Sequence, residues 1–258
     1  MEKKEEILRV RNLDISFETT AGVVNAVRGV NLTVNRGETV AIVGESGSGK
    51  SVSAKAIMGI LAKNGTIDRG QITFSYYRNP EERVTREILQ MKKEEIRRHI
   101  NGKRIAMVFQ EIQKKRQLSV IYITHDLGVV AKVADYVNVM YAGKIVESGT
   151  VEDVFYDPRH PYTWGLLSAM PDLGTDDERL YTIPGSPPNL LHKVTGDAFA
   201  PRNKYALNID SRLEPPMFKI SETHSAATWL LHPKAPKVDM PPELRDRIER
   251  MTKEGGIA

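Results

Sequence analysis

The spacing of apolar residues near the start of the chain predicts antiparallel β-strands. Residues 7–10 and 13–17 alternate between apolar and polar side chains, and residues 23–27 and 30–34 continue the pattern. Alternation with a period of two is typical of strands that bury one face. The sequence Thr20-Ala21-Gly22 separates the two pairs and predicts a hairpin turn. We therefore expect a small antiparallel β region ahead of the rest of the fold.

Three later runs are apolar at most positions, as buried strands are. They comprise residues 39–43, 104–109 and 119–124, and each contains β-branched side chains. Residues 71–74 alternate like a further strand, whereas residues 52–61, rich in Ala, Met and Ile, predict a helix. Strands interleaved with helices favour an α/β fold.

Charge and proline content distinguish the remaining segments. Residues 85–98 combine apolar positions with many charges, and we expect them to form an amphipathic helix with a solvated face. Residues 134–142 and 144–146 predict a hairpin, and residues 150–155 a short helix. Beyond Pro158 the frequent prolines predict a loop-rich tail.

Residues 44–51 fit the pattern of the phosphate-binding P-loop, and a buried strand and a helix flank them as that pattern requires. Glycines let backbone N–H groups converge on phosphate oxygens, and the start of the helix adds positive potential. Lys50 would reach the β- and γ-phosphates, and the Ser51 hydroxyl would ligate Mg²⁺. A plain Gly/Ser-rich turn is the alternative, but it leaves the Lys-Ser pair and the flanking elements unexplained. The segment consists of Gly44, Glu45, Ser46, Gly47, Ser48, Gly49, Lys50 and Ser51.

Two polar residues directly follow predicted buried strands. Gln110 follows residues 104–109, and His125 follows residues 119–124. In open α/β sheets, groups just beyond the carboxyl ends of parallel strands contact ligands. An isolated His or Gln is more often a surface or capping residue. The P-loop on the same chain favours a ligand role for both residues.

Phe17 in the predicted antiparallel region has two interpretations. Its ring could stack on a nucleotide base, or it could close a small β core at its edge. The sequence leaves both interpretations open.

Composition excludes several classes of function. The chain of 258 residues contains no cysteine, which excludes disulfides, thiolate metal sites and cysteine nucleophiles. No apolar run reaches about 18 residues, and we expect no transmembrane segment. The charged N-terminus lacks the apolar stretch of a signal peptide, and we expect the chain to stay on the cytosolic side. The net charge of +4 suits phosphate ligands or an acidic surface, and a solvated exterior equally well.

Together these segments resemble the ATP-binding cassette (ABC) family, in particular the ATPase subunits of oligopeptide and dipeptide importers. Phe17 matches the adenine-stacking aromatic residue, Met107-Val108-Phe109-Gln110 the Q-loop, and Ile123-Thr124-His125-Asp126-Leu127 the switch-histidine segment. Four tail motifs resemble the C-terminal extension of peptide importers: His160-Pro161-Tyr162-Thr163, Ala169-Met170-Pro171, Ile183-Pro184-Gly185 and Ala200-Pro201-Arg202. The resemblance implies a nucleotide-binding domain over residues 1–158 and a C-terminal extension over residues 159–258.

The resemblance also implies an architecture and a set of partners. The fold would be α/β, with a P-loop NTPase core, an N-terminal antiparallel β region and a loop-rich C-terminal extension. ATP and Mg²⁺ would bind, with Gln110 near the metal and the attacking water and His125 near the γ-phosphate. The partners would be membrane permease subunits and a second ATPase subunit. The chain would sit peripherally at the cytoplasmic face of the membrane, without nucleic acid.

The tail departs from the family pattern at four positions. Some relatives hold an iron–sulfur cluster in this extension through four cysteines. The corresponding positions here are Asp197, Asn203, Asp210 and Thr228. Because none of them supplies a thiolate, we expect no iron–sulfur cluster.

A larger departure interrupts the nucleotide-binding domain near 110/111. Between the Q-loop and the switch histidine the family places a helical subdomain with a Leu-Ser-Gly-Gly motif, then a strand ending in Asp and a catalytic Glu. None of this is present, because Gln110 runs directly into a segment that resembles the helix before the switch-histidine strand. The connection to Leu118 is also shorter than the roughly dozen residues of a parallel crossover.

We consider three functions for a chain with these residues. The first is the ATP-binding subunit of a peptide importer, with impaired hydrolysis. The second is a non-hydrolysing nucleotide-binding or interaction module, which the missing segment favours. The third, a P-loop kinase, would leave the Q-loop, the switch histidine and the tail motifs unexplained.

Overall fold

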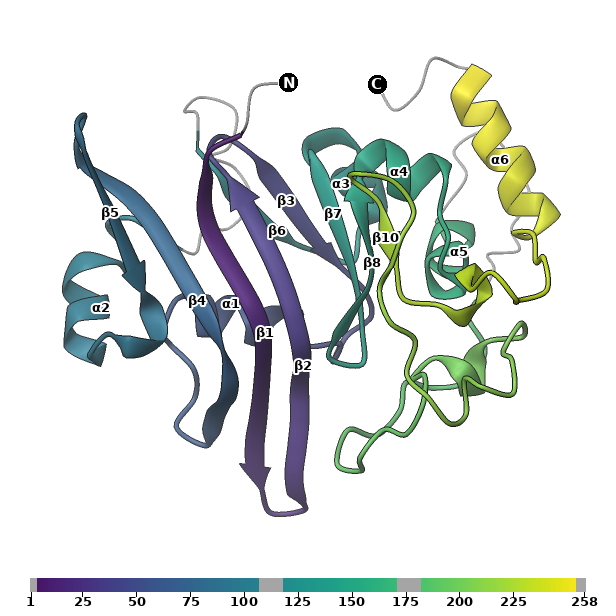
Figure 1. The fold of residues 1–258 in the computed structure, drawn as a ribbon, viewed down its shortest axis with the longest axis horizontal. Helices are drawn as coiled ribbons and strands as arrows, with labels where there is room; N and C mark the ends of the chain where they lie inside the picture. Colours follow the sequence, from purple (N-terminus) through teal and green to yellow (C-terminus); the bar gives the residue numbers. More distant parts are fainter. Residues whose placement is uncertain (1–3, 107–117, 171–181, 254–258) are drawn as a thin grey trace.

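The computed structural model describes residues 4–106, 118–170 and 182–253, which form two sheets flanked by helices (Figure 1). One sheet is four-stranded with the order β2-β1-β4-β5, and the other is six-stranded with the order β6-β3-β7-β8-β10-β9. The strands are β1 (Glu6–Thr19), β2 (Gly22–Asn35), β3 (Thr39–Val43), β4 (Gly65–Asn79), β5 (Glu82–Glu87), β6 (Val120–Ile123), β7 (Tyr136–Tyr141), β8 (Lys144–Thr150), β9 (Phe218–Lys219) and β10 (Ser225–Ala226). The α-helices are α1 (Lys50–Ile57), α2 (Lys93–His99), α3 (Leu127–Val133), α4 (Val151–Tyr156), α5 (Pro161–Ser168) and α6 (Pro242–Lys253).

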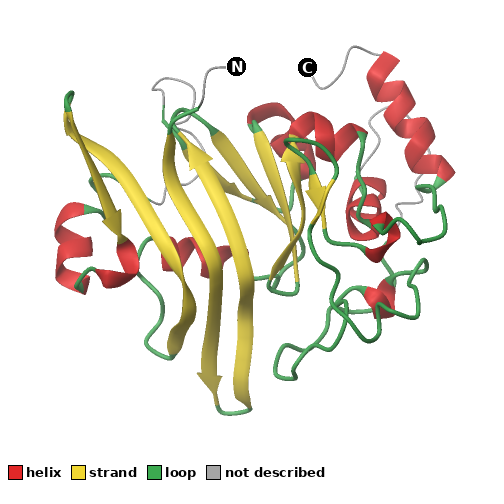
Figure 2. Cartoon of the chain, in the orientation of Figure 1, coloured by secondary structure: helices red, strands yellow, loops and turns green. Residues whose placement is uncertain are grey.

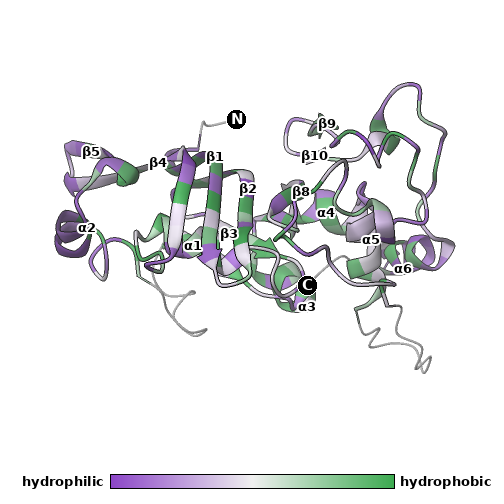
Figure 3. Cartoon of the chain, turned by 90° about the horizontal axis from the view of Figure 1, so that it is seen from below, coloured by the Kyte–Doolittle hydropathy of each residue, from purple (hydrophilic) through white to green (hydrophobic). Residues whose placement is uncertain are grey.

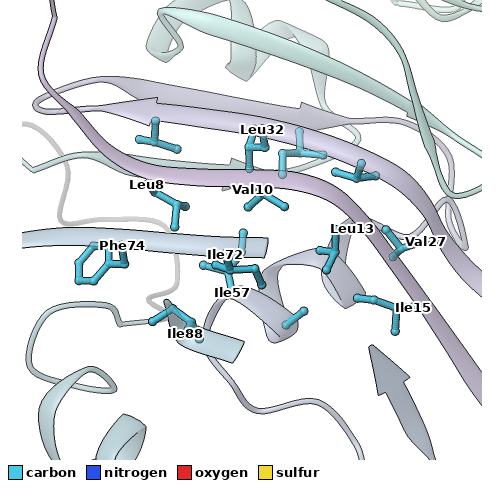
Figure 4. Close-up of a cluster of buried hydrophobic side chains, with 14 of the residues drawn as sticks. Leu8, Val10, Leu13, Ile15, Val27, Leu32, Ile57, Ile72, Phe74 and Ile88 are labelled. Carbon is cyan, nitrogen blue, oxygen red and sulfur yellow. The ribbon is translucent and has the colours of Figure 1, made fainter. Parts of the chain in front are cut away.

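The antiparallel sheet is the N-terminal β region that the alternating pattern predicts. The two expected pairs of short strands merge into two 14-residue strands, β1 and β2, which turn at Thr20 and Ala21. Buried side chains of β1 such as Val10 and Ile15 point to one face, where Ile72 of β4 and Ile57 of α1 meet them (Figure 4). This buried cluster packs the antiparallel sheet onto the helix that follows the P-loop.

The second sheet carries the parallel strands of the α/β core. All five residues of β3 are buried, as expected for a strand between two others, and β6 and β7 run parallel to it on either side. The predicted hairpin around Gly143 is confirmed as β7 and β8, and Thr150 caps α4. These elements confirm the predicted fold: a P-loop NTPase core preceded by an antiparallel β region and followed by a loop-rich extension.

The helix predicted over residues 85–98 is wrong in its first half. Residues 82–87 form β5, residues 88–90 a 3₁₀ turn, and only residues 93–99 are α-helical. β5 pairs with the edge of β4, with Val84 opposite Tyr76, and this long-range pairing is not visible in a local charge pattern. The remaining helix, α2, is strongly hydrophilic and lies at the end of the antiparallel sheet (Figure 3).

The strand predicted over residues 104–109 is wrong in the part that the structure describes. Arg104 lies in a turn, and Ile105 makes an isolated bridge to Asn101 rather than joining a sheet. Residues 107–109 lie outside the described residues, so whether this strand pairs with β6 stays untested. Along the part of the chain that the structure describes, β6 ends its sheet.

The C-terminal extension is mostly loop, as its prolines predict (green in Figure 2). It adds β9 and β10 to the edge of the second sheet, where Ser225 pairs with Ser148. The 12-residue helix α6 was not expected. Among the described residues, no helix is both long and apolar enough to cross a membrane. The division into residues 1–158 and 159–258 stays a prediction.

Candidate functional site

The loop between β3 and α1 depends on two glycines that no other residue could replace without distortion. Gly44 has φ +142°, and a Cβ there would lie 2.0 Å from the carbonyl oxygen of Met140. Gly49 has φ +101°, and its Cβ would lie 2.5 Å from the carbonyl oxygen of Ala26. Both values of φ are ones that L side chains rarely adopt. The loop is therefore pressed against β7 on one side and β2 on the other.

Lys50 folds back into this loop from the first turn of α1. Its Nζ donates to the carbonyl oxygens of Gly44 and Glu45, both at 2.7 Å, and to Ser48 Oγ at 3.3 Å. Burial lowers the pKa of Lys50, and the Glu45 carboxylate opposes that shift. A cation held among neutral carbonyl oxygens is well placed to meet an anion entering the loop.

The outer part of the loop is open to a ligand. Ser46, Gly47 and Ser51 are exposed, and a Cβ on Gly47 would meet nothing within 4 Å. Ser48 is instead buried, and its carbonyl oxygen accepts the N–H of Gly143 at 3.0 Å. The hydroxyl of Ser51 in the first turn of α1 is thus accessible to a metal-bound ligand.

The structure brings His125 to the same sheet edge as the P-loop. Ile42 of β3 and Ile123 of β6 are paired in parallel register, so the chain leaves both strands at the same level. Gly44 and His125 each lie two residues beyond that pair, and His125 is exposed. Asp126 caps α3 by accepting the N–H of Val129 at 3.1 Å. Gln110 lies outside the described residues, and its predicted role stays a prediction.

Phe17 lies near the end of β1 in the antiparallel sheet. It pairs with Val24 of β2, two residues before Ala26, the residue that contacts Gly49. The ring also lies close over Gly65 and packs partly against the buried cluster. Both interpretations of Phe17 therefore stay open, as a base-stacking surface or as an edge of the core.

Sequence reasoning missed two residues of the extension that reach the loop. Tyr162 Oη accepts the backbone N–H of Glu45 at 2.9 Å. The Arg202 guanidinium binds the Glu45 carboxylate with two hydrogen bonds, at 2.9 and 3.1 Å. Both residues belong to tail motifs from which the sequence predicts a family resemblance but no contact with the P-loop. Glu45 is the sequence feature that could have pointed to them. An acidic residue inside a loop expected to bind anions needs a partner elsewhere in the chain.

The four positions that correspond to cysteines in some relatives are all buried. Each accepts a nearby backbone N–H: Asp197 from Phe199, Asn203 from Tyr205, Asp210 from Leu207, and Thr228 from Leu230. Burial raises the pKa of Asp197 to about 6. These side chains stabilise local turns of the extension, and the expectation that no iron–sulfur cluster binds stays a prediction.

Comparison with known proteins matches two families along the chain. Residues 27–153 match the ABC transporter family, and residues 146–209 match the family described as oligopeptide/dipeptide transporter, C-terminal region. The first match contains the P-loop and the switch-histidine segment. The second contains Tyr162 and Arg202.

Individual relatives match at both ends of the chain. An oligopeptide transport ATP-binding protein of Bacillus subtilis is 39% identical, covering 95% of this chain and 94% of the relative. A second, from Streptococcus pneumoniae, is 34% identical and covers 99% of this chain and 98% of the relative. Among solved structures, an ABC transporter subunit from Clostridium perfringens covers 60% of this chain and 92% of its own, with 19% identity and a TM-score of 0.40.

The alignment lengths locate the missing segment inside the chain. The alignment to the Streptococcus pneumoniae relative runs over 357 positions, whereas this chain has 258 residues and is covered almost completely. The relative therefore carries residues with no counterpart here, and they must lie internally because both ends match. With relatives at this identity and coverage, the chain belongs to the ABC transporter family.

Proposed function

We propose that the chain is the ATP-binding subunit of an importer for oligopeptides or dipeptides. The observation that carries this proposal is the loop between β3 and α1, with its two obligatory glycines and the Lys50 ammonium at its centre. The relatives are described as oligopeptide and dipeptide transport ATP-binding proteins, and the match to the C-terminal region of that class supports the choice of cargo.

Each site residue has a role in this proposal. The backbone of the loop and Lys50 bind the phosphates, and Ser51 ligates Mg²⁺. Phe17 stacks on the adenine, His125 approaches the γ-phosphate, and Gln110 approaches the metal and the water. The shared level of Gly44 and His125 at one sheet edge supports the assignment of His125.

The partners follow from the same proposal. Membrane permease subunits and a second ATPase subunit would complete the importer, with this chain at the cytoplasmic face of the membrane. Mg²⁺ would accompany ATP and would neutralise part of the charge of the phosphates.

A second candidate is a nucleotide-binding module that does not hydrolyse ATP. The observation in its favour is the sequence itself, which contains neither a Leu-Ser-Gly-Gly motif nor a strand ending in Asp-Glu between Gln110 and His125. Both candidates bind ATP, and only turnover separates them.

Lys50→Ala should weaken MgATP binding by roughly 1.5–3 kcal/mol for each charge-assisted hydrogen bond that the ammonium makes to phosphate. The substitution removes the cation while leaving the loop glycines in place. Isothermal titration of the parent and the variant with MgATP measures the difference. Lys55→Ala is the matched control, because Lys55 lies on the same helix and is exposed. Equal affinity in the Lys50→Ala variant and the parent would overturn the proposed function.

Phe17→Ala should weaken MgATP binding by roughly 1–3 kcal/mol, taking the stacking of a single base as the guide. Phe17→Tyr should be nearly neutral because it keeps the ring. Inorganic triphosphate, which lacks the base, should bind the parent and Phe17→Ala equally well. A loss of thermal stability with unchanged MgATP affinity would support the core-packing interpretation instead.

A further inference from the structure

A single residue of the P-loop, Glu45, is held at both its side chain and its backbone by the C-terminal extension. The Arg202 guanidinium spans the two carboxylate oxygens of Glu45, and the Arg202 side chain is only 5% exposed. Tyr162 Oη accepts the Glu45 N–H at 2.9 Å. These hydrogen bonds join residues that are 117 and 157 positions apart in the sequence.

Hydrogen bonds to residues other than Glu45 also hold the Arg202 side chain in place. Its Nε donates to the carbonyl oxygen of Pro184 at 2.8 Å, and Nη2 donates to that of Ile183 at 3.2 Å. Nη1 also donates to Tyr141 Oη at 3.3 Å. A guanidinium with this many fixed partners loses little further freedom when it binds a carboxylate. The pair is therefore unlike an exposed surface ion pair.

Tyr162 is fixed in a similar way. Its ring packs against those of Tyr141 and Phe199, with centroids 4.6 and 5.4 Å apart. Burial raises the pKa of Tyr162, so the phenol stays neutral and its oxygen can accept the Glu45 N–H. The extension thus sets the path of the loop at its second residue.

Because Glu45 is negatively charged, the position of its carboxylate affects the binding of an anionic ligand in the loop. Lys50 Nζ already lies 2.7 Å from the Glu45 carbonyl oxygen, and the Glu45 carboxylate acts on Lys50 electrostatically. A carboxylate released next to the loop would pair with the lysine ammonium. It would also repel phosphate oxygens entering the loop.

We propose that Arg202 is a positioning residue of the nucleotide site, which holds the Glu45 carboxylate away from Lys50 and leaves the ammonium available to phosphate. The inference rests on the proposed nucleotide binding at the P-loop and gives the C-terminal extension a part in it. A purely structural role, in which the ion pair only ties the extension to the core, predicts a loss of stability without a specific loss of affinity.

A double-mutant cycle on MgATP binding separates the two roles. Arg202→Met in the parent should weaken binding about tenfold or more, the scale of one charge-assisted hydrogen bond. In a Glu45→Gln background, where there is no carboxylate to release, the same substitution should change affinity by less than about twofold. Arg159→Met is the matched control, because the Arg159 guanidinium pairs with Asp157 rather than with a residue of the P-loop.

The outcomes are distinguishable. If the parent binds MgATP and Arg202→Met binds it equally well, the inference is wrong while the proposed function stands. An equal loss of affinity in both backgrounds would also overturn it, since the effect would then not pass through the carboxylate. If Arg202→Met does not fold, the same cycle is measured with Arg202→Lys. Lysine cannot make the two hydrogen bonds that the guanidinium makes to the Glu45 carboxylate. A parent that does not bind MgATP would overturn the proposed function and this inference together.

Discussion

The purified chain should release phosphate from MgATP at least about a thousandfold more slowly than the ~1 s⁻¹ at the lower end of typical enzyme turnover. Attack on the γ-phosphate needs a positioned water and charge stabilisation around the phosphoryl group. His125 lies at the right sheet edge for such a task, but the sequence lacks the catalytic carboxylate that the family places before the switch-histidine strand. The Leu-Ser-Gly-Gly loop through which a second copy would complete the nucleotide site is missing as well.

Nearby acidic residues do not replace the missing carboxylate. Asp126 is occupied as the cap of α3, and Glu45 is bound to Arg202. Glu111 lies outside the described residues, at the start of a segment predicted to be helical. Groups that act as one catalytic unit lose most of their combined effect when several are removed. We therefore expect this chain to bind MgATP but to hydrolyse it very slowly.

Phosphate release over hours, with and without Mg²⁺, measures the turnover. The Lys50→Ala variant purified in parallel sets the background from contaminating ATPases. A parent rate at or near that background, together with measurable MgATP binding, is the expected result. Turnover faster than about a thousandth of 1 s⁻¹ would contradict it and would require a carboxylate from elsewhere in the chain.

The P-loop and its surroundings could be predicted because their determinants are local. A five-residue apolar run, three glycines and a Lys-Ser pair fix strand, loop and helix within a short stretch. The structure adds the reason for two of those glycines, since Gly44 and Gly49 leave no room for a Cβ. His125 directly follows a predicted strand, and the parallel register of β6 with β3 brings it level with the loop, while its role stays a prediction.

Features that depend on distant parts of the chain could not be predicted. The charges of residues 85–87 suit the predicted helix, but the edge of β4 offers hydrogen bonds that favour a strand. The pairing of Glu45 with Arg202 joins residues 157 positions apart, and no local pattern contains it. Helix α6 is a different case, because Leu244, Ile248 and Met251 recur at the spacing i, i+4 and i+7 that predicts an amphipathic helix.

Glu147→Leu should lower the free energy of unfolding by roughly 1–3 kcal/mol for each hydrogen-bond donor that it leaves without an acceptor. Glu147 of β8 is fully buried, and its Oε1 lies 2.8 Å from Nε2 of His224. Because a carboxylate can only accept, this nitrogen carries the proton. The same carboxylate accepts the backbone N–H groups of Arg159 and His160, at 2.6 and 3.1 Å. Leucine would leave these three donors without their acceptor, two of them in buried hydrogen bonds and that of Arg159 in a partly buried one.

This network matters for the nucleotide site because it fixes the start of α5. His160 caps that helix by accepting the N–H of Tyr162 at its Nδ1, 3.0 Å away. Burial lowers the pKa of His160 to about 3, so the ring stays neutral at physiological pH and Nδ1 can accept. Tyr162 in turn holds the N–H of Glu45 in the P-loop. We therefore expect Glu147→Leu to weaken MgATP binding by the folded protein as well as to destabilise it.

Urea unfolding of the parent, Glu147→Leu and Glu152→Leu measures the stability change. Glu152 is the matched control, because it lies five residues along on α4 and is exposed. Its substitution should change the free energy of unfolding by no more than about 0.5 kcal/mol. If Glu147→Leu unfolds at the same urea concentration as Glu152→Leu, the carboxylate does not hold the start of α5. The hydrogen bonds that link Glu147 of β8 through Tyr162 to the P-loop would then not contribute to stability.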